Sequence, residues 1–336
     1  MITSTTSSDL YPWLVADIGG TNARFGLVRG PGERVDDVLA VRCAEFDSAA
    51  AAARSYLARI AARDGTTPRP RMVGFAVATA IHGDTVKLTN NAWTISRPAA
   101  AAELGAERVH LFNDFEALAL ALPRLAPTDV QPLGGSLPNR RLPMAVIGPG
   151  TGLGVATCVP TPEGHWLALA GEGGHVTASA ADDFESEVLR HVRAEFGHVS
   201  AERVLSGIGL PALHRAVVAT RGGQSDPRTP EEITRHALEG SDPHCVATME
   251  TFCAMLGGFA GNVALTVGAR GGVFVAGGIA QQLGAMLQRS QFRARFEAKG
   301  RFRAYLAPIA TSLVIAPHAA LAGAAQGIEN QLLAHG

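Results

Sequence analysis

Hydrophobic residues occur in short runs that glycine, proline and polar residues separate. Apolar runs typical of β-strands lie at 13–16, 23–28, 72–78, 109–112, 144–147, 155–159, 272–276 and 311–316. Apolar residues at helical spacing predict helices at about 48–63, 183–196, 243–268 and 319–333. Strands that alternate with helices indicate an α/β fold.

A strand–turn–strand pattern occurs twice along the chain. The first turn is Asp17-Ile-Gly-Gly-Thr-Asn22, where we expect Gly19 and Gly20 to supply unusual φ values. The second turn is Gly148-Pro-Gly-Thr-Gly-Leu-Gly154. We interpret the repeat as a structural duplication. A chain of 336 residues exceeds the usual size of one core, so two domains are expected, with the Pro/Gly-rich segment 126–143 as a crossing between them.

The amino-acid composition is that of a globular protein with sizeable hydrophobic cores. Apolar residues make up 47%, charged residues 18%, and the formal net charge is −1, so nothing indicates a nucleic-acid or membrane partner. The basic stretch 289–303 is interpreted as an amphipathic helix with a solvated face. No apolar run is expected to span a bilayer.

The cysteines and the start of the chain predict the compartment. Cys43, Cys158, Cys245 and Cys253 are widely spaced and form no Cys-x-x-Cys pair, which is typical of a reduced, intracellular protein. Residues 1–10 are rich in Ser and Thr and lack the apolar core of a secretory signal. We therefore expect a soluble, cytoplasmic protein.

Glycine-rich turns follow three of the expected strands, at 17–22, 148–154 and 277–278. Such turns let backbone N–H groups approach a phosphate, and the Thr151 hydroxyl adds a donor. Each turn taken alone is better explained as a structural turn than as a phosphate contact. The chain contains neither Gly-x-x-x-x-Gly-Lys-Ser/Thr nor a Gly-x-Gly-x-x-Gly that opens a helix in the first βαβ unit. A P-loop enzyme and a dinucleotide fold are therefore disfavoured.

Polar residues at strand ends are the candidates for chemistry. Asp17 either caps its turn or holds a magnesium ion, directly or through water. Asp114 follows a strand and begins a helix, so it is either an N-cap or a carboxylate that accepts a proton from a hydroxyl, with Asn113 beside it.

Two further segments carry groups that suit a polyol. Glu172 and His175 lie among glycines in the 170–175 loop, which is otherwise a mobile surface loop. Glu202 lies near an expected helix start that Ser200 would cap, and there a capping role is as plausible as a functional one. A closed sugar site needs many paired donors and acceptors, since each unpaired polar group costs roughly 1–3 kcal/mol.

Taken together, these motifs resemble the bacterial glucokinase family, within the superfamily of sugar kinases, actin and heat-shock ATPases. The resemblance covers about residues 13–330 and rests on several pieces in the family's order. They are Asp17–Arg24, Leu88-Thr-Asn-Asn-Ala-Trp93, Asn113-Asp-Phe115, Gly148–Gly154, Gly171-Glu-Gly-Gly-His175, Ser200–Gly207 and Gly272–Ile279.

The resemblance implies a two-domain actin-like ATPase fold, of the ribonuclease-H-like type, with an active-site cleft between the domains. Residues 1–124 plus 316–336 would form the small α/β domain, and 125–315 the large one. ATP and Mg²⁺ would be required, and a homodimer is expected. The reaction implied is transfer of a phosphoryl group from ATP to the 6-hydroxyl of glucose, the first step of glycolysis.

The resemblance also implies roles for single residues. Asn113, Asp114, Glu172, His175 and Glu202 would bind glucose, with Asp114 as the catalytic base. A larger set would hold the ATP phosphates or the nucleotide, with Asp17 also at the metal: Asp17, Gly19, Gly20, Thr21, Asn22, Gly150, Thr151, Gly152, Gly277 and Gly278.

Two departures and two alternatives accompany this interpretation. Ala78-Thr-Ala80 stands where related chains usually carry a proline, and the chain lacks the Cys-rich zinc motif and DNA-binding region of the repressor-type sugar kinases. One alternative is a kinase for another hexose or an N-acetylhexosamine. The other is a non-catalytic sugar-binding regulator, which the presence of Asp17, Asp114 and Thr151 disfavours.

Overall fold

The computed structural model describes residues 10–334, so residues 1–9 of the Ser/Thr-rich start considered above lie outside the described residues. The chain divides into two compact units. Unit 1 comprises residues 1–125, 161–168 and 317–336, and unit 2 comprises residues 126–160 and 169–316. The domain boundaries expected from the sequence, 1–124 plus 316–336 and 125–315, stay a prediction.

Unit 1 is built on a five-stranded sheet with the order β3-β2-β1-β4-β7. The strands β1 and β2 and the strands β2 and β3 pair antiparallel, whereas β4 is parallel to both β1 and β7. Their bounds are β1 (Trp13–Ile18), β2 (Asn22–Val28), β3 (Asp36–Arg42), β4 (Met72–Val77) and β7 (Arg108–Asn113), and a separate pair is β5 (Thr85–Lys87) with β6 (Thr94–Ser96). The carboxyl ends of β1, β4 and β7 therefore share one edge, where ligands gather in α/β sheets.

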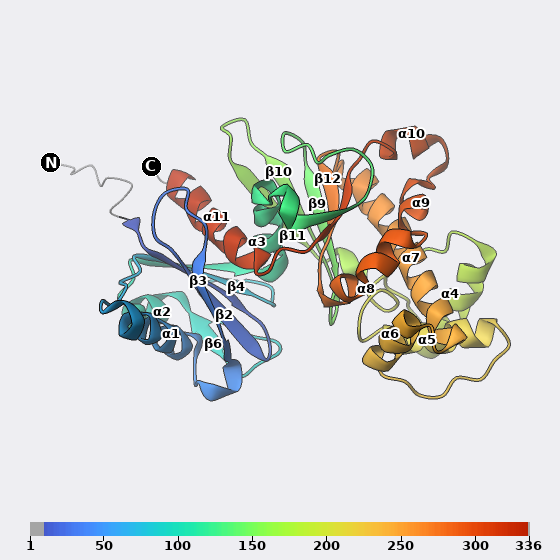
Figure 1. Ribbon diagram of the computed structural model, residues 1–336, viewed down its shortest axis with the longest axis horizontal. Coiled ribbons are helices and arrows are strands. Elements are labelled where there is room, and N and C mark those ends of the chain that lie inside the picture. Colours follow the sequence, from blue (N-terminus) through green and yellow to red (C-terminus); the bar gives the residue numbers. More distant parts are fainter. Residues whose placement is uncertain (1–9, 335–336) are drawn as a thin grey trace. The chain divides into compact units, whose positions relative to one another are not determined.

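Helices cover both faces of this sheet (Figure 1). One hydrophobic cluster joins the strands to α1 (Ala49–Asp64) and α2 (Arg97–Leu104). A second cluster joins them to α3 (Asp114–Ala121) and α11 (Ala319–Ala334). The last two helices pack so closely that a Cβ on Gly323 would meet the Ala117 backbone.

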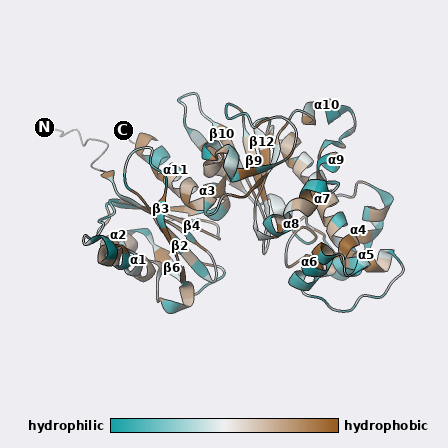
Figure 2. Ribbon diagram, in the orientation of Figure 1, coloured by the Kyte–Doolittle hydropathy of each residue, from teal (hydrophilic) through white to brown (hydrophobic). Residues whose placement is uncertain are grey.

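Unit 2 is built on a six-stranded sheet with the order β11-β10-β9-β12-β13-β8. The strands β9 and β10 pair antiparallel, β12 is parallel to both β9 and β13, and β8 closes the far edge antiparallel to β13. Figure 2 shows hydrophobic residues on the central strands β9 and β12. The bounds are β8 (Val130–Gly134), β9 (Met144–Pro149), β10 (Leu153–Pro160), β11 (Trp166–Gly171), β12 (Gly272–Val275) and β13 (Thr311–Val314).

The expected crossing at 126–143 is wrong, because it contains the edge strand β8. Pro132 within β8 disguised the strand, since proline is tolerated in sheets mainly at edges. The strand order of the two sheets supports the expected duplication. The series β3-β2-β1-β4-β7 and β11-β10-β9-β12-β13 place corresponding strands in the same positions.

The helices of unit 2 pack around the long helix α7 (Pro243–Val267). Gly257 and Gly261 of α7 approach the backbones of Phe292 and Phe296 in α9, which explains their small size. The other helices are α4 (Asp183–Phe196), α5 (Leu210–Thr220), α6 (Pro230–Glu239), α8 (Gly278–Arg289), α9 (Phe292–Glu297) and α10 (Arg303–Leu306).

Two expectations for these helices are wrong. The basic stretch 289–303 is not one amphipathic helix, since α9 and α10 are separated by a turn in which Gly300 has a φ of 54°. Its Arg293 guanidinium is turned inward and donates to the Ile309 carbonyl at 2.8 Å. Among the described residues, α7 is long and apolar enough to cross a membrane, contrary to the sequence-based expectation, although 61% of its most apolar window is buried as in a core helix.

Candidate active site

The first glycine turn, residues 17–22, joins β1 to β2. The Gly19 amide donates to the Asn22 carbonyl at 3.0 Å and closes the turn. Neither Gly19 nor Gly20 has a positive φ, so the expectation of unusual φ values is wrong. A Cβ on Gly20 would instead lie 2.8 Å from the Asn90 carbonyl oxygen. Close backbone approach, not φ, requires glycine here.

Asn90 and Asn91 are site residues to which sequence reasoning gave no role. Asn91 Nδ2 donates to the Gly19 carbonyl at 3.1 Å, and its Oδ1 accepts from the Trp93 amide at 2.8 Å. Both asparagines line a small hollow with residues 18–20. Two adjacent amides inside the recognised motif at 88–93 were the signal that could have identified them.

Asp17 lies at the carboxyl end of β1, partly buried. Arg24 Nη1 is 3.5 Å from its Oδ2. Burial raises the pKa of Asp17 above its ordinary value, and the neighbouring Arg24 guanidinium opposes that rise. A carboxylate in these surroundings favours a further cation close by. Of the described residues, no group of three or more His, Cys, Asp and Glu side chains forms a protein-only metal site.

Asn113 and Asp114 stand where β7 passes into α3, beside the ends of β1 and β4. Asn113 is the N-cap: its Oδ1 accepts from the Phe115 amide at 2.9 Å and the Glu116 amide at 3.2 Å. Its Nδ2 donates to the Thr79 carbonyl at 3.3 Å. The N-cap interpretation of Asp114 is therefore wrong, because its neighbour fills that position.

Asp114 is the first residue of α3, and its Oδ1 accepts from the Phe115 amide at 2.9 Å. Burial raises the pKa of Asp114 to about 6, and the negative charge of Asp17 adds to this rise. The Phe115 hydrogen bond opposes it. A carboxylate with a pKa near 6 is both available at neutral pH and basic enough to accept a proton during a reaction.

The second glycine turn, residues 148–154, joins β9 to β10 in unit 2. The Gly150 amide donates to the Gly152 carbonyl at 2.9 Å. A Cβ on Gly150 would meet nothing within 4 Å, and Thr151 at the tip is exposed. A Cβ on Gly152 would lie 2.5 Å from Glu202 Oε2. The tip is thus open to a ligand, whereas its second half packs against Glu202.

Glu172, His175 and Glu202 come together within unit 2. His175 Nε2 lies 3.8 Å from Glu172 Oε2, and His175 Nδ1 lies 3.9 Å from Glu202 Oε1. Glu172 and His175 are exposed, whereas the Glu202 side chain is 22% exposed. The Leu153 amide donates to Glu202 Oε2 at 2.9 Å. Glu202 therefore lies between the imidazole and the second glycine turn.

The 200–209 segment that carries Glu202 is a series of turns, not the start of a helix. Ser200 Oγ accepts from the Arg203 amide at 3.2 Å, so its capping role is kept for one turn only. The first α-helix after it is α5, which begins at Leu210. Gly207 and Gly209 lower the helix propensity of this segment.

Gly277 and Gly278 stand where β12 passes into α8. Gly277 has a φ of 92°, and a Cβ on it would lie 2.6 Å from the Pro149 carbonyl oxygen. Gly278 begins α8 and faces open space. The free N–H groups at the start of α8 therefore lie beside the second glycine turn, as expected for groups that hold an anion.

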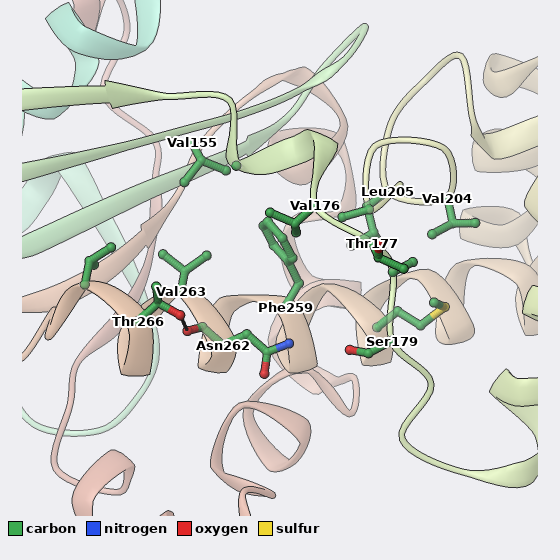
Figure 3. A pocket seen from close by; sticks show the side chains of 15 residues that line it. Val155, Val176, Thr177, Ser179, Val204, Leu205, Phe259, Asn262, Val263 and Thr266 are labelled. Carbon is green, nitrogen blue, oxygen red and sulfur yellow. Dashed lines mark hydrogen bonds between the residues drawn. The ribbon is translucent and has the colours of Figure 1, made fainter. Parts of the chain in front are cut away.

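One hollow in unit 2 is a largely apolar pocket of about 180 Å³. Figure 3 shows Phe259 of α7 reaching toward Val176, with Asn262 and Thr266 on the same helix. The 173–179 and 201–205 segments also line it. Gly173 is a lining residue, but Glu172, His175 and Glu202 are not. The pocket thus lies beside the segments that carry the candidate residues and does not contain their charged groups.

Comparison with known proteins places this geometry in a family. A glucokinase family profile matches residues 14–331. A glucokinase of Paramagnetospirillum magneticum is 48% identical over 93% of this chain and 96% of its own length. A glucokinase of Chromobacterium violaceum is 44% identical over 98% and 92%, respectively. The crystal structure of a glucokinase from an Antarctic psychrotroph superposes with a TM-score of 0.88 at 34% identity, covering 95% of this chain and 99% of that one.

The match extends over nearly the whole chain and over both units. It confirms the α/β class and the two-domain actin-like fold that sugar kinases of this type share. ATP follows as the phosphoryl donor that the kinase family uses. The chain belongs to the glucokinase family, the enzymes that phosphorylate glucose.

Proposed function

We propose that the chain moves the γ-phosphoryl group of ATP to the 6-hydroxyl of glucose with Asp114 as the general base. The observation that carries this role is the partly buried Asp114 carboxyl at the start of α3, with its pKa raised to about 6. Asn113 beside it is held by its own capping hydrogen bonds. A base in a fixed position is what phosphoryl transfer asks of a protein.

In the proposed step, Asp114 accepts the proton of the 6-hydroxyl as that oxygen attacks the γ-phosphorus. A new O–P bond forms, the bond between the γ-phosphorus and the bridging oxygen breaks, and ADP leaves with the electron pair. The proton then passes from Asp114 to solvent. Burial serves this step twice, because it raises the pKa of Asp114 and because it keeps water from competing for the phosphoryl group.

We propose that glucose is bound by Asn113 and Asp114 together with Glu172, His175 and Glu202. Carboxylates accept hydrogen bonds from sugar hydroxyls, and imidazole and amide groups donate to them. The support in unit 2 is the proximity of His175 to both glutamates. The support in unit 1 is the Asn113–Asp114 pair at the sheet edge.

We propose that the glycine turns hold the phosphates of ATP. The open Gly150, the exposed Thr151 and the start of α8 at Gly278 support this role in unit 2. The residues of unit 1 that we propose to hold phosphate are Asp17, Gly19, Gly20, Thr21 and Asn22. In unit 2, Gly152 and Gly277 complete the proposed set.

Mg²⁺ would be held by Asp17, directly or through water, together with the ATP phosphates. The donor set fits, because Mg²⁺ is commonly bound by one or two carboxylates plus substrate phosphates and waters. When bound, the ion would neutralise charge on the phosphates. Asp17 would orient the ion beside the phosphates.

We also propose that the enzyme is a cytoplasmic homodimer. The family resemblance supports the dimer. The four free, buried cysteines support a reducing compartment. Light scattering on the purified chain measures the mass of the particle, and a mass of one chain would refute the dimer.

A panel of sugars and donors tests the proposed function. Purified chain is incubated with Mg²⁺, ATP, and either glucose, mannose or N-acetylglucosamine, and sugar phosphate and ADP are measured by phosphorus NMR. We expect glucose 6-phosphate in a one-to-one ratio with ADP and the highest kcat/KM for glucose. A higher kcat/KM for another sugar would reassign the substrate. Glucose binding by calorimetry without phosphoryl transfer would indicate a regulator.

A further inference from the structure

The 200–209 segment joins the two parts of the candidate site in unit 2. On one side, the Ala201 and Glu202 amides donate to the Val176 and Gly174 carbonyls, both at 2.8 Å. On the other side, the Gly207 amide donates to the Gly150 carbonyl at 2.8 Å and the Ile208 amide donates to the Thr151 carbonyl at 3.3 Å. The same ten residues therefore hold both the loop that carries Glu172 and His175 and the second glycine turn.

The Glu202 side chain adds a direct link between these parts. Its Oε2 accepts from the Leu153 amide at 2.9 Å, whereas its Oε1 lies 3.9 Å from His175 Nδ1. One carboxylate thus faces the second glycine turn with one oxygen and the proposed glucose residue with the other. A glucose hydroxyl that binds Glu202 would therefore contact a carboxylate that is already hydrogen-bonded to the second glycine turn.

Ser206 closes the segment on itself. The side chain is fully buried, and its hydroxyl donates to the Glu202 carbonyl at 2.6 Å and accepts from the Gly209 amide at 3.1 Å. Gly209 approaches the carbonyls of Glu202 and Arg203 so closely that a Cβ would overlap them. Both hydrogen bonds of Ser206 therefore fix the position of Glu202 relative to the turns that follow it.

Most apolar side chains of this segment are buried in the core of unit 2, but a hollow lies beside them. Ala201, Val204 and Leu205 line the apolar pocket of about 180 Å³ described above (Figure 3). Side chains beside a hollow lack part of the dispersion contacts that would fix a fully packed segment.

We propose that Ser206 is a positioning residue through which glucose binding and nucleotide binding in unit 2 strengthen each other. The proposal rests on the proposed function, which places glucose at Glu202 and phosphate at the second glycine turn. Ser206 touches neither substrate. It keeps residues 202–209 in the one arrangement in which Glu202 can serve both. Such coupling is reciprocal, so nucleotide should tighten glucose by the same factor by which glucose tightens nucleotide.

Ser206→Ala tests this role, with Thr234→Val as a matched control. Thr234 is also buried, in α6, and its hydroxyl also donates to a carbonyl four residues earlier, that of Pro230 at 2.8 Å. The affinity of each variant for glucose is measured by calorimetry with and without a non-hydrolysable ATP analogue. Coupling factors of about 5–150 are typical. We expect S206A to lose at least fivefold of the wild-type factor, T234V to retain it, and Ser206→Thr to restore part of it.

Hydrogen exchange of the ligand-free proteins separates this claim from the proposed function. S206A should exchange faster than wild type in peptides spanning 149–155 and 172–178, and T234V should not. If S206A does not fold, the test uses wild-type protein alone. The proposal then predicts that glucose slows hydrogen exchange in peptides spanning 149–155. Wild-type coupling and exchange retained in S206A, or no effect of glucose at 149–155, would overturn the role of Ser206. A wild-type chain that transfers no phosphoryl group refutes the proposed function but leaves the exchange comparison valid.

Discussion

Asp114 shows how one position can be predicted from sequence while its local role is not. A polar pair at the end of an apolar strand was enough to mark Asn113 and Asp114 as candidates. Sequence did not show which of the two caps α3, because both residue types are good N-caps. In the structure Asn113 takes the cap, and Asp114 accepts from the Phe115 amide without capping the helix. That division leaves a carboxylate available for chemistry.

The first prediction at this scale concerns pH. Asp114 must be deprotonated to act as a base, and its pKa in the folded protein is about 6. We expect kcat/KM for glucose to fall about tenfold for each pH unit below this pKa. Above the pKa, kcat/KM should reach a plateau, because Asp114 is then deprotonated. Steady-state rates between pH 4.5 and 8 measure this. A profile that stays flat down to pH 4.5 would remove Asp114 from the role of base.

The second prediction concerns stability. Because folding raises the pKa of Asp114, its contribution to the free energy of unfolding is fully present below the unfolded pKa of about 3.9 and is lost as pH rises through about 6. The neutral Asp114→Asn variant should therefore be at least as stable as wild type at pH 8, and this advantage should shrink toward pH 4. Urea unfolding at both pH values tests it. Clear destabilisation at pH 8 would mean that the charged carboxylate is held by favourable contacts.

The contacts that other site residues make were beyond sequence reasoning. Asn90 and Asn91 reach the first glycine turn from a loop between β5 and β6, and no spacing along the chain predicts that approach. The contact between Glu202 and the Leu153 amide likewise joins residues 49 positions apart. The sequence shows which residue types could take part in the chemistry. It does not show which distant segments meet, because those contacts depend on the fold.

At the scale of elements, the positions of the glycine turns were predicted correctly, but the reason given for their glycines was only partly right. Clusters of glycine after apolar runs located both turns. The expected cause, unusual φ, does not apply at Gly19 and Gly20 but does at Gly277. Glycine spacing reports that space is scarce or that φ is positive, and sequence alone does not distinguish the two.

A pair of variants in the second glycine turn gives the third prediction. A Cβ at Gly150 meets nothing in the protein, whereas one at Gly152 meets the Glu202 carboxylate. We expect Gly150→Ala to fold normally and bind glucose normally but to raise KM for ATP, because the methyl group enters the space proposed for phosphate. Gly152→Ala should weaken glucose binding as well, because it displaces Glu202. Calorimetry with glucose and steady-state kinetics with ATP distinguish them, and identical effects of both variants would contradict the assignment.

Regular elements with strong periodicity were the most predictable. The helices α1, α4, α7 and α11 agree with their expected ranges to within about two residues, as do the central strands β1, β4 and β9. The edge strand β8 and the broken 289–306 region were not predicted. Pro132 disguised β8, whereas in the 289–306 region tertiary contacts such as that of Arg293 with Ile309 override the local pattern.

At the scale of the whole molecule, the duplication is the feature that sequence suggested and topology supports. The two glycine turns differ in sequence but occupy corresponding positions in the two sheets. Each joins the first two strands of its repeat, at 17–22 in unit 1 and at 148–154 in unit 2. Ligands gather at the carboxyl ends of parallel strands, so a repeated sheet offers two such edges. The proposed function assigns phosphate to both turns.

The fourth prediction is that glucose protects residues in both units at once. The proposal draws on Asn113 and Asp114 in unit 1 and on Glu172, His175 and Glu202 in unit 2. Hydrogen exchange with saturating glucose should therefore slow in peptides spanning 110–118 and in those spanning 170–177. The 230–239 peptides of α6 provide an internal reference. Protection confined to one unit would show that the other does not bind the sugar.

The most direct test of the central claim compares wild type and Asp114→Asn in one coupled assay with glucose, ATP and Mg²⁺. We predict that wild type forms glucose 6-phosphate at the rate at which it forms ADP. We predict that Asp114→Asn loses about 10²–10⁴-fold in kcat while its affinity for glucose changes little, since a general base contributes a factor of that size. Turnover by Asp114→Asn within a few fold of wild type would contradict the claim.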